Sequence, residues 1–314
     1  MKRFAFLIII VFLLVLIWSG AWFFAASLIK NQVASLNNPN NQITLSCKEF
    51  KVSGFPFKLN NICKSANIID GDKQFQIAQI NTIISAFSPT KININAISPF
   101  KYSNAFFASE QELRFSEFKI TASTSWLKFN QLKISIKNLQ YLDLLIGEEK
   151  IADVENFNFD LSNASNKKNT FDLNIKLDGL HVNLFNILDG QGILEAEINA
   201  MPDDIRLFAD QKFFQNWQRA NGQITLDEFK GQDKNSNFNI IGEIGLNERG
   251  FANGNFTIKS SGIIEQISQN IDPQMRPVFF GSQKEDGSFE QDIKIKNGTI
   301  YRGLFPLGNL PSLF

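Results

Sequence analysis

Two hydrophobic patterns divide this chain: a continuous apolar run at its start, and an alternation of apolar and polar residues after it. No charged residue occurs from Phe4 to Ile29, directly after Lys2 and Arg3. As a helix this run would be roughly 39 Å long at about 1.5 Å per residue, whereas about 20 apolar residues are enough to cross the hydrocarbon layer of a membrane. Residues 1–30 are therefore predicted to form a transmembrane anchor.

The charges beside the apolar run predict its orientation. Lys2 and Arg3 favour the cytoplasmic side, so we expect a single-pass protein of the inner membrane, with a cytoplasmic N-terminus and a periplasmic body. A cleaved signal peptide is the alternative, because Ala25 and Ser27 have the spacing of a cleavage site. The run is, however, longer than the roughly 7 to 15 apolar residues of most signal peptides. Both interpretations place the body outside the cytoplasm.

Beyond Asn41 the alternation has a period of two, as β-strands with one buried face require. The clearest runs are Ile92-Ile94-Ala96, Leu132-Ile134-Ile136, Phe157-Phe159-Leu161, Phe171-Leu173-Ile175-Leu177, Ile224-Leu226, Phe238-Ile240, Ile244-Leu246, Phe256-Ile258 and Ile293-Ile295. Their polar positions favour antiparallel strands with one solvated face over parallel strands covered on both sides. The predicted fold class is mainly β: a transmembrane helix, then long antiparallel, curved or folded-over sheets with one or two helices.

Two interruptions of the alternation predict local features. The phase changes between Phe115 and Phe118, which predicts a bulge. Asp178-Gly179 predicts a tight turn before Leu180, because glycine readily adopts the positive φ that hairpin turns need.

Residues 203–220 have helical spacing and follow Met201-Pro202-Asp203-Asp204, a sequence that favours the start of a helix. The apolar positions of this stretch are Ile205, Phe208, Phe213, Phe214 and Trp217. We expect them to pack on the sheet as a lid, because Asp203, Asp204 and Asp210 would disfavour an anionic membrane surface. A second, shorter helix is predicted from 261 to 270.

These elements predict four regions. Residues 1–30 form the anchor, and residues 31–41, rich in Asn and containing Pro39, form a linker. Residues 42–202 form a β-rich domain. Residues 203–314 form a helix plus a β-rich C-terminal unit that shares a continuous sheet with the first.

Composition supports a folded body and narrows the classes of partner. The chain is 44% hydrophobic and 20% charged, with 31 basic and 31 acidic residues. This balance gives no overall basic charge for a nucleic acid or an anionic lipid as the main partner. The two cysteines, Cys47 and Cys63, lie in the exported part, where thiols tend to oxidise, so we expect a disulfide between them. A redox or metal site is the alternative. However, the two cysteines do not have the Cys-x-x-Cys spacing of a redox site, and two thiolates do not make a metal site without further ligands.

The sequence contains few residues in patterns typical of catalytic sites. Motifs for zinc proteases, nucleophile elbows and phosphate loops are absent from the sequence. His181 is the single histidine, and alternation predicts it on the polar face. The acidic pairs Asp227-Glu228 and Glu285-Asp286 are adjacent in sequence, so within a strand their carboxylates would face opposite ways. We therefore predict no catalytic, cofactor or metal residues, and a protein that is not an enzyme.

Several short motifs resemble a known family. They are Trp22, Cys47, Gly54-Phe55-Pro56-Phe57, Cys63, the run from Trp217 through Gly222-Gln223-Ile224-Thr225-Leu226, Asn297-Gly298-Thr299-Ile300-Tyr301 and Pro306-Leu307-Gly308-Asn309-Leu310-Pro311. Together they resemble an uncharacterised alphaproteobacterial family, domain of unknown function 2125, over nearly the whole chain. The resemblance implies an inner-membrane-anchored periplasmic protein and gives no catalytic residues. Long sheets after one span are also similar, more loosely, to AsmA-like envelope proteins, whose folded-over sheets are thought to conduct lipids.

Three function hypotheses follow. The first is a non-enzymatic envelope protein that binds or conducts phospholipid along one apolar sheet face. The residues expected to face the lipid are Phe115, Ile134, Ile136, Phe159, Leu173, Ile175 and Ile240. The second is a structural or interaction scaffold of the cell envelope, in which the same face is a closed core. The third, more remote, is an exported hydrolase that uses carboxylates alone. The sequence identifies no protein partner.

Overall fold

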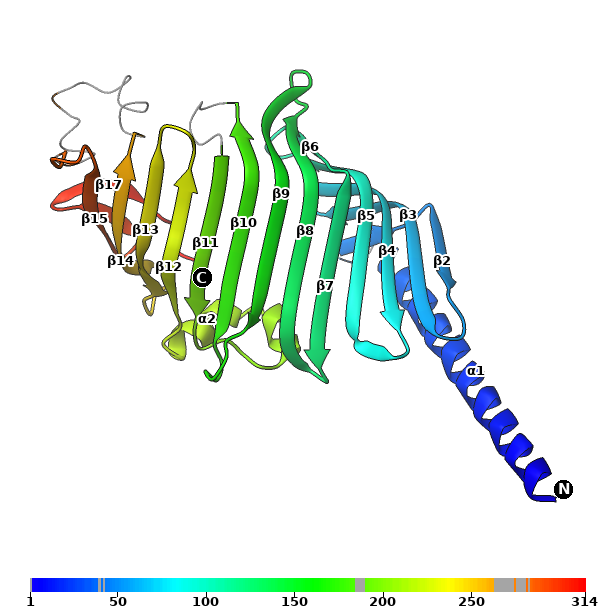
Figure 1. The fold of residues 1–314 in the computed structure, drawn as a ribbon. Helices are drawn as coiled ribbons and strands as arrows, with labels where there is room; N and C mark the ends of the chain where they lie inside the picture. The colour runs from blue at the N-terminus through cyan, green and yellow to red at the C-terminus, as the bar shows by residue number, and fades with distance from the viewer. Residues whose placement is uncertain are drawn as a thin grey trace. The chain divides into compact units, whose positions relative to one another are not determined.

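The computed structural model describes residues 2–38, 41, 43–183, 190–262, 274, 281 and 283–314. As predicted, the chain is mainly β, with one apolar helix at its start and one large antiparallel sheet (Figure 1). The chain divides into two compact units. Unit 1 comprises Met1–Thr121 and Tyr141–Glu149, and unit 2 comprises Ala122–Gln140 and Lys150–Phe314.

The apolar run forms the helix α1 (Lys2–Leu36), and its part from Ile8 to Leu36 is long and apolar enough to cross a membrane. α1 continues to Leu36, so the first six residues of the predicted linker are helical. Contacts with the first two strands hold this end of the helix against the sheet.

Unit 1 is a series of antiparallel strands that begins beside α1. Its strands are β1 (Ile43–Ser46), β2 (Glu49–Ser53), β3 (Lys58–Asp70), β4 (Lys73–Ser85), β5 (Ser88–Asn104) and β6 (Ser109–Arg114). Both β1 and β2 pair with β3, which continues to β4, β5 and β6. The strands β7 (Glu117–Ser125) and β8 (Lys128–Asp143) contribute residues to both units.

Unit 2 consists of antiparallel strands in sequence order and a small helical lid. Its elements are β9 (Glu149–Asn163), β10 (Phe171–Val182), β11 (Gly190–Ile198), the 3₁₀ helix η1 (Ile205–Ala209), α2 (Phe213–Arg219), β12 (Gln223–Gln232), β13 (Asn237–Leu246), β14 (Ala252–Ser261), β15 (Phe289–Lys296), β16 (Thr299–Arg302) and β17 (Phe305–Asn309). Each strand from β9 to β17 pairs with the next one in the chain. Since β11 pairs directly with β12, the sheet is continuous across residue 203.

The structure corrects the single helix predicted for residues 203–220. Two short helices, η1 and α2, replace it, because Asp210 makes a local turn between them. The Asp210 carboxylate accepts a hydrogen bond from the backbone N–H of Lys212, and its carbonyl accepts one from Phe213. Such local bonds compete with helix continuation. The predicted lid role is nevertheless correct, since Phe208, Phe213 and Trp217 pack against sheet residues.

Three further predictions differ from the structure, and a fourth falls outside the described residues. Gly179, with φ of 62°, lies in a bulge inside β10 and not in a hairpin turn. The phase change after Phe115 marks the end of β6 and the start of β7, so it separates two strands and is not a bulge within one. Residues 238–246, predicted as two strands, form the single strand β13. The helix predicted from 261 to 270 lies outside the described residues, apart from its first two positions.

The predicted disulfide is confirmed. Cys47 and Cys63 are joined, with their Cα atoms 5.4 Å apart. Cys63 lies on β3 and Cys47 directly follows β1, so the bond ties the chain that leaves α1 to the first long strand.

We expect replacement of both cysteines, Cys47→Ser and Cys63→Ser, to lower the free energy of unfolding by about 3 kcal/mol, as estimated for a loop of this length. Urea unfolding in detergent measures the effect. Reductant should lower the unfolding midpoint of the parent protein to a similar extent and leave the double variant unchanged. Equal midpoints for the variant and the oxidised parent would contradict the expectation.

Candidate functional site

The apolar side chains of unit 2 line up in rows that cross several strands. Paired residues in an antiparallel sheet share a face, so the strand register defines each row. What we call the Ile175 row consists of Phe159, Ile175, Leu194, Phe229, Ile240 and Ile258, one residue from each strand from β9 to β14. The Leu173 row beside it consists of Leu161, Leu173, Ala196, Leu226, Gly242, Phe256 and Ile293. We call this side of the sheet the apolar face of unit 2.

A bulge in β12 keeps these rows on one face. Leu194 pairs with Phe229, and Ala196 pairs with Leu226, so one extra residue of β12 is accommodated between the two pairs. Without that extra residue, the side chains beyond it would point to the opposite face of the sheet. The acidic pair Asp227-Glu228 lies in this bulge, which accounts for it structurally.

The lid closes one end of the apolar face. Among the described residues, Phe171, Met201 and Trp217 form the buried cluster, and Ile198 and Ile224 pack against it. Phe171, Ile198 and Ile224 form the row beside the Leu173 row. Figure 1 shows α2 at this end of β10, β11 and β12.

Trp217 fixes the position of the lid. Its indole N–H donates to the carbonyl of Asn199 at 2.8 Å, and its own carbonyl accepts from the N–H of Gly222 at 2.8 Å. A Cβ atom on Gly222 would lie 2.2 Å from the Trp217 ring, so the close approach requires glycine. This contact gives a physical reason for the Trp217 and Gly222 motif found in the sequence.

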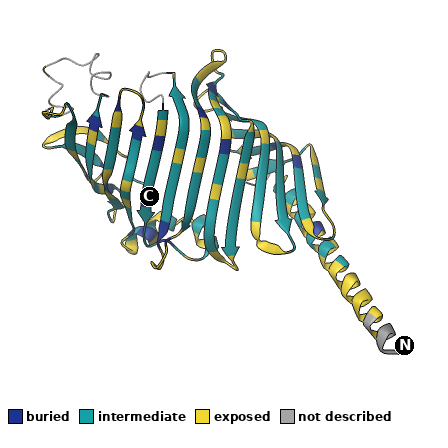
Figure 2. Cartoon of the chain, viewed as in Figure 1, coloured by how far each residue is buried: buried dark blue, intermediate teal, exposed yellow. Residues whose placement is uncertain are grey.

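Beyond the lid the apolar face is only half-buried. The six side chains of the Ile175 row all belong to the intermediate burial class, and none of them packs against the lid cluster. Figure 2 shows most of the strand length in this intermediate class. A sheet packed against a second protein layer would bury such side chains more completely.

The structure brings together four of the seven predicted lipid-facing residues. Phe159, Ile175 and Ile240 belong to the Ile175 row, and Leu173 belongs to its neighbour.

The remaining three predicted residues lie outside the Ile175 and Leu173 rows. Ile134 and Ile136 lie on β8 in unit 2, alternating with Lys133, which contacts Asp160 on the polar face. Alternation therefore puts both isoleucines on the apolar side. Phe115 follows β6 in unit 1, so it is not part of these rows.

Unit 1 has an apolar surface of its own. Phe75, Phe100, Tyr102 and Leu113 come from β4, β5 and β6 and line an open groove of about 420 Å³, together with Lys73, Gln111 and Tyr141. Burial raises the pKa of the Tyr141 phenol, and the neighbouring Asp143 carboxylate adds to the effect. Closer to α1, a second set of paired residues on β3, β4 and β5 is apolar: Leu59, Ile84 and Ile92.

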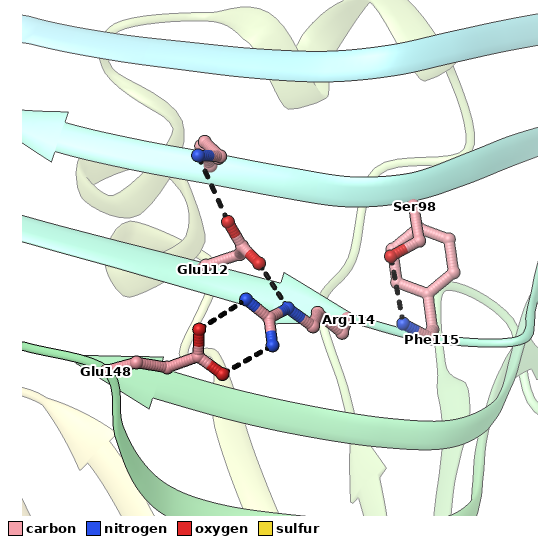
Figure 3. A network of polar contacts seen from close by, with 6 residues as sticks. Ser98, Glu112, Arg114, Phe115 and Glu148 are labelled. Atoms are coloured by element: carbon pink, nitrogen blue, oxygen red, sulfur yellow. Dashed lines mark hydrogen bonds and ion pairs between the residues drawn. The ribbon is translucent and has the colours of Figure 1, made fainter. Parts of the chain in front are cut away.

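A network of ion pairs joins strands of unit 1 (Figure 3). Glu112 alternates with the groove residues Gln111 and Leu113, so the network lies on the opposite side of the sheet from the aromatic groove. Glu112 has a side chain only 5% exposed and contacts both Lys101, at 3.2 Å, and the Nε of Arg114. Arg114 then binds Glu148 through two parallel bonds of 2.6 and 2.9 Å. Both Glu112 oxygens are therefore paired with cations, and the geometry supports a structural clamp.

The sequence did not predict this clamp. Glu112 and Arg114 are two residues apart on β6, so they share a face, and this spacing was the one local signal. Lys101 and Glu148 approach them only through strand pairing and the turn after β8, which the sequence does not specify locally.

The other candidate groups are placed apart from one another. His181 is half-buried on β10 opposite Asp153 of β9. Asp286 accepts hydrogen bonds from Ser288 in a turn, which lowers the pKa of its carboxyl. Asp204 contacts Arg206, and this contact likewise lowers its pKa. Within the described part of the chain, no three His, Cys, Asp or Glu side chains gather as ligands of a metal ion.

The clamp predicts a pH dependence. Arg114 holds the pKa of Glu148 below its ordinary value of 4.5, so the pair stabilises the folded state above that value. The stabilisation is lost as the pH falls through the lowered pKa. We expect Glu148→Gln to lower the urea midpoint at pH 6 and to have a smaller effect at pH 3. The control is Glu149→Gln, the next residue in the chain. An equal effect of Glu148→Gln at both pH values would contradict this assignment.

Comparison with known proteins identifies the family. No curated protein sequence matches this chain. Residues 22–311 match the sequence model of a family described as uncharacterized protein conserved in bacteria (DUF2125). The matched range includes the motifs around Trp22, Cys63 and Trp217. The description of the family does not mention AsmA-like envelope proteins. Because it covers almost the entire chain, this protein belongs to the DUF2125 family.

Proposed function

We propose that this protein is a membrane-anchored envelope protein that binds or conducts lipid chains along the apolar face of unit 2. The observation that carries the proposal is the Ile175 row, an in-register series of half-buried apolar side chains beyond the lid. An apolar face beside a membrane has to be covered by protein or by ligand.

The dimensions of the row suit a lipid chain. Six neighbouring strands about 4.8 Å apart span about 24 Å, whereas half of a bilayer's hydrocarbon layer is about 15 Å thick. An extended acyl chain therefore fits along the row.

The energetics favour exchange over permanent retention. Each methylene group removed from water contributes about 0.8 kcal/mol to the free energy of binding. A lipid chain that has left the membrane is therefore retained on the protein. Lipid tails and leucine side chains are similarly apolar, so transfer from the bilayer to the face changes the free energy little. A surface with these properties can accept and release lipid.

The proposal requires no catalytic group on the protein. Asp227-Glu228 lies in a β-bulge, Asp286 makes a turn, and Glu112 is held between Lys101 and Arg114. These local roles support a binding protein over an enzyme.

We expect Ile175→Asp to reduce the phospholipid that co-purifies with the full chain by about tenfold, because a charge facing the acyl chain opposes binding by at least about 1.4 kcal/mol. Native mass spectrometry after gentle detergent extraction measures the bound lipid. Lys176→Asp is the matched control, since Lys176 is exposed on the opposite face of the same strand.

Ile175→Leu provides a second control for the fold and should retain lipid, because it conserves apolar volume. A parent protein that carries no lipid would contradict the proposal and favour a scaffold. Equal lipid loss in Ile175→Asp and Lys176→Asp would also contradict it.

The proposed location is the inner membrane, with a cytoplasmic N-terminus and a periplasmic body. Lys2 and Arg3 before the span and the Cys47–Cys63 disulfide support this arrangement. We expect alkaline phosphatase fused after Phe314 to be active in cells, because that enzyme needs an oxidising compartment. Activity of a cytoplasmic reporter alone at the same position would reverse the orientation. Release of a shortened protein from the membrane would contradict a retained anchor.

A further inference from the structure

Two tryptophans connect α1 to the turn between β2 and β3. The indole N–H of Trp18 donates to the carbonyl of Pro56 at 2.9 Å, and that of Trp22 donates to the carbonyl of Lys58 at 2.9 Å. Phe55 packs on the same helix, stacked on Phe23 with ring centroids 5.6 Å apart. The turn is therefore held alongside the helix at the level of Trp18 to Trp22.

Aromatic rings project from this turn and from the neighbouring turn between β4 and β5. Phe57 is 54% exposed and Phe87 is 79% exposed, yet their rings stack with centroids 5.5 Å apart. We call residues 54–57 and 86–87 together the aromatic turn pair. Both turns lie at the same end of the strands, since the N–H of Ala86 donates to the carbonyl of Phe57 at 2.8 Å.

Several backbone polar groups in these turns form hydrogen bonds within the protein. The indole N–H groups of Trp18 and Trp22 donate hydrogen bonds to the carbonyls of Pro56 and Lys58. The carbonyl of Gly54 accepts from the N–H of Lys58 at 2.9 Å, and the N–H of Phe87 donates to the hydroxyl of Ser85. Bonding of this kind is required of backbone that enters a medium without water.

The charges around the turns also suit a membrane surface. No acidic residue occurs in residues 50–69 or 73–109. The charged residues next to the two turns are the exposed lysines Lys58 and Lys91. Lysine side chains extend toward lipid phosphates while their methylene stems remain in the apolar region.

The position of the tryptophans along α1 sets the depth. A hydrocarbon layer of about 30 Å accommodates about 20 helical residues, so a span that begins at Phe4 ends near Phe23. On this scale Trp18 lies about 21 Å and Trp22 about 27 Å from the start of the span. The turn bonded to them lies at the depth of the outer part of the hydrocarbon layer, where aromatic residues are enriched.

We propose that the aromatic turn pair inserts into the membrane leaflet from which the body emerges. The inference rests on α1 being the membrane anchor of the proposed function, and it adds a second membrane contact made by the sheet itself. Insertion places the paired residues Leu59, Ile84 and Ile92, which lie on β3, β4 and β5 near the turns, at the membrane surface. Lipid chains in the leaflet then adjoin the first apolar residues of the sheet.

Depth-dependent fluorescence quenching tests this inference on the full chain. The protein, with its disulfide intact, is reconstituted in phosphatidylcholine vesicles with a bimane label on one added cysteine. Ser88→Cys reports the turn pair, because Ser88 is exposed beside Phe87. We expect nitroxide lipid to quench this label and aqueous iodide to leave it largely unquenched.

Two reference labels calibrate the result. Gly20→Cys reports the helix, since an added Cβ at Gly20 meets no atom within 4 Å. Ala105→Cys reports the opposite end of β5, roughly 50 Å away along the strand. We expect nitroxide lipid to quench the first reference label and iodide to quench the second.

Paired phenylalanine variants separate insertion from simple exposure. Phe57→Ser with Phe87→Ser should lower lipid quenching of the Ser88 label at least about twofold, because two rings that would bury in lipid are lost. Phe106→Ser with Phe107→Ser is the matched control, since these rings are 76% and 72% exposed at the turn after β5. That control pair should leave the quenching unchanged.

The outcomes are distinguishable. A lipid-quenched Gly20 label together with an iodide-quenched Ser88 label would overturn the insertion of the turn pair and leave the anchor intact. A Gly20 label that nitroxide lipid does not quench would overturn both the anchor and the inference. Equal effects of the two serine pairs would overturn the role assigned to Phe57 and Phe87.

Discussion

The structure depends on one constraint, which is that strand register keeps apolar side chains on a common face over many strands. Pairing aligns Ile175 with Phe159 on one side and with Leu194 on the other, and the same row continues to Ile258. A slip of one residue in any strand would turn its apolar set toward the polar side. The bulge at residues 227–228 is therefore essential to the face, because it restores the phase within β12.

The same face has two parts with different roles. At one end the lid buries Phe171 under Trp217 and Met201, and this cluster stabilises unit 2. Beyond the lid, the Ile175 row remains half-buried, which is the property that a lipid-binding surface needs. Because the buried cluster lies at one end, the proposed lipid contact at the other end would not require this cluster to open.

The sequence predicted what depends on local periodicity. Alternation predicted the strands that carry Phe159, Ile175 and Ile240, and these residues do share a row. It could not predict the pairing of Glu112 and Arg114 with Lys101 and Glu148, because that contact depends on non-local strand pairing.

The incorrect secondary-structure predictions lie where local backbone geometry overrides the periodicity of apolar residues. Residues 203–220 have helical spacing, but the Asp210 side chain bonds the N–H of Lys212 and divides the stretch into two short helices. Similarly, Gly179 suggested a hairpin turn, whereas β10 continues through a bulge there. The contacts of Trp18 and Trp22 with the β2–β3 turn were not predictable either, since they join the N-terminal helix to a turn more than 30 residues away in the sequence.

Photo-crosslinking in living cells measures whether lipid contacts the apolar face of unit 2. A photoreactive residue at Ile175 or Ile240 reports on the apolar face, and one at Lys176 reports on the opposite face. If lipid binds there, phospholipid adducts form from Ile175 and Ile240 and none form from Lys176. Crosslinks from Ile175 and Ile240 to protein alone would contradict lipid binding and identify the face as a closed core or a protein-binding surface.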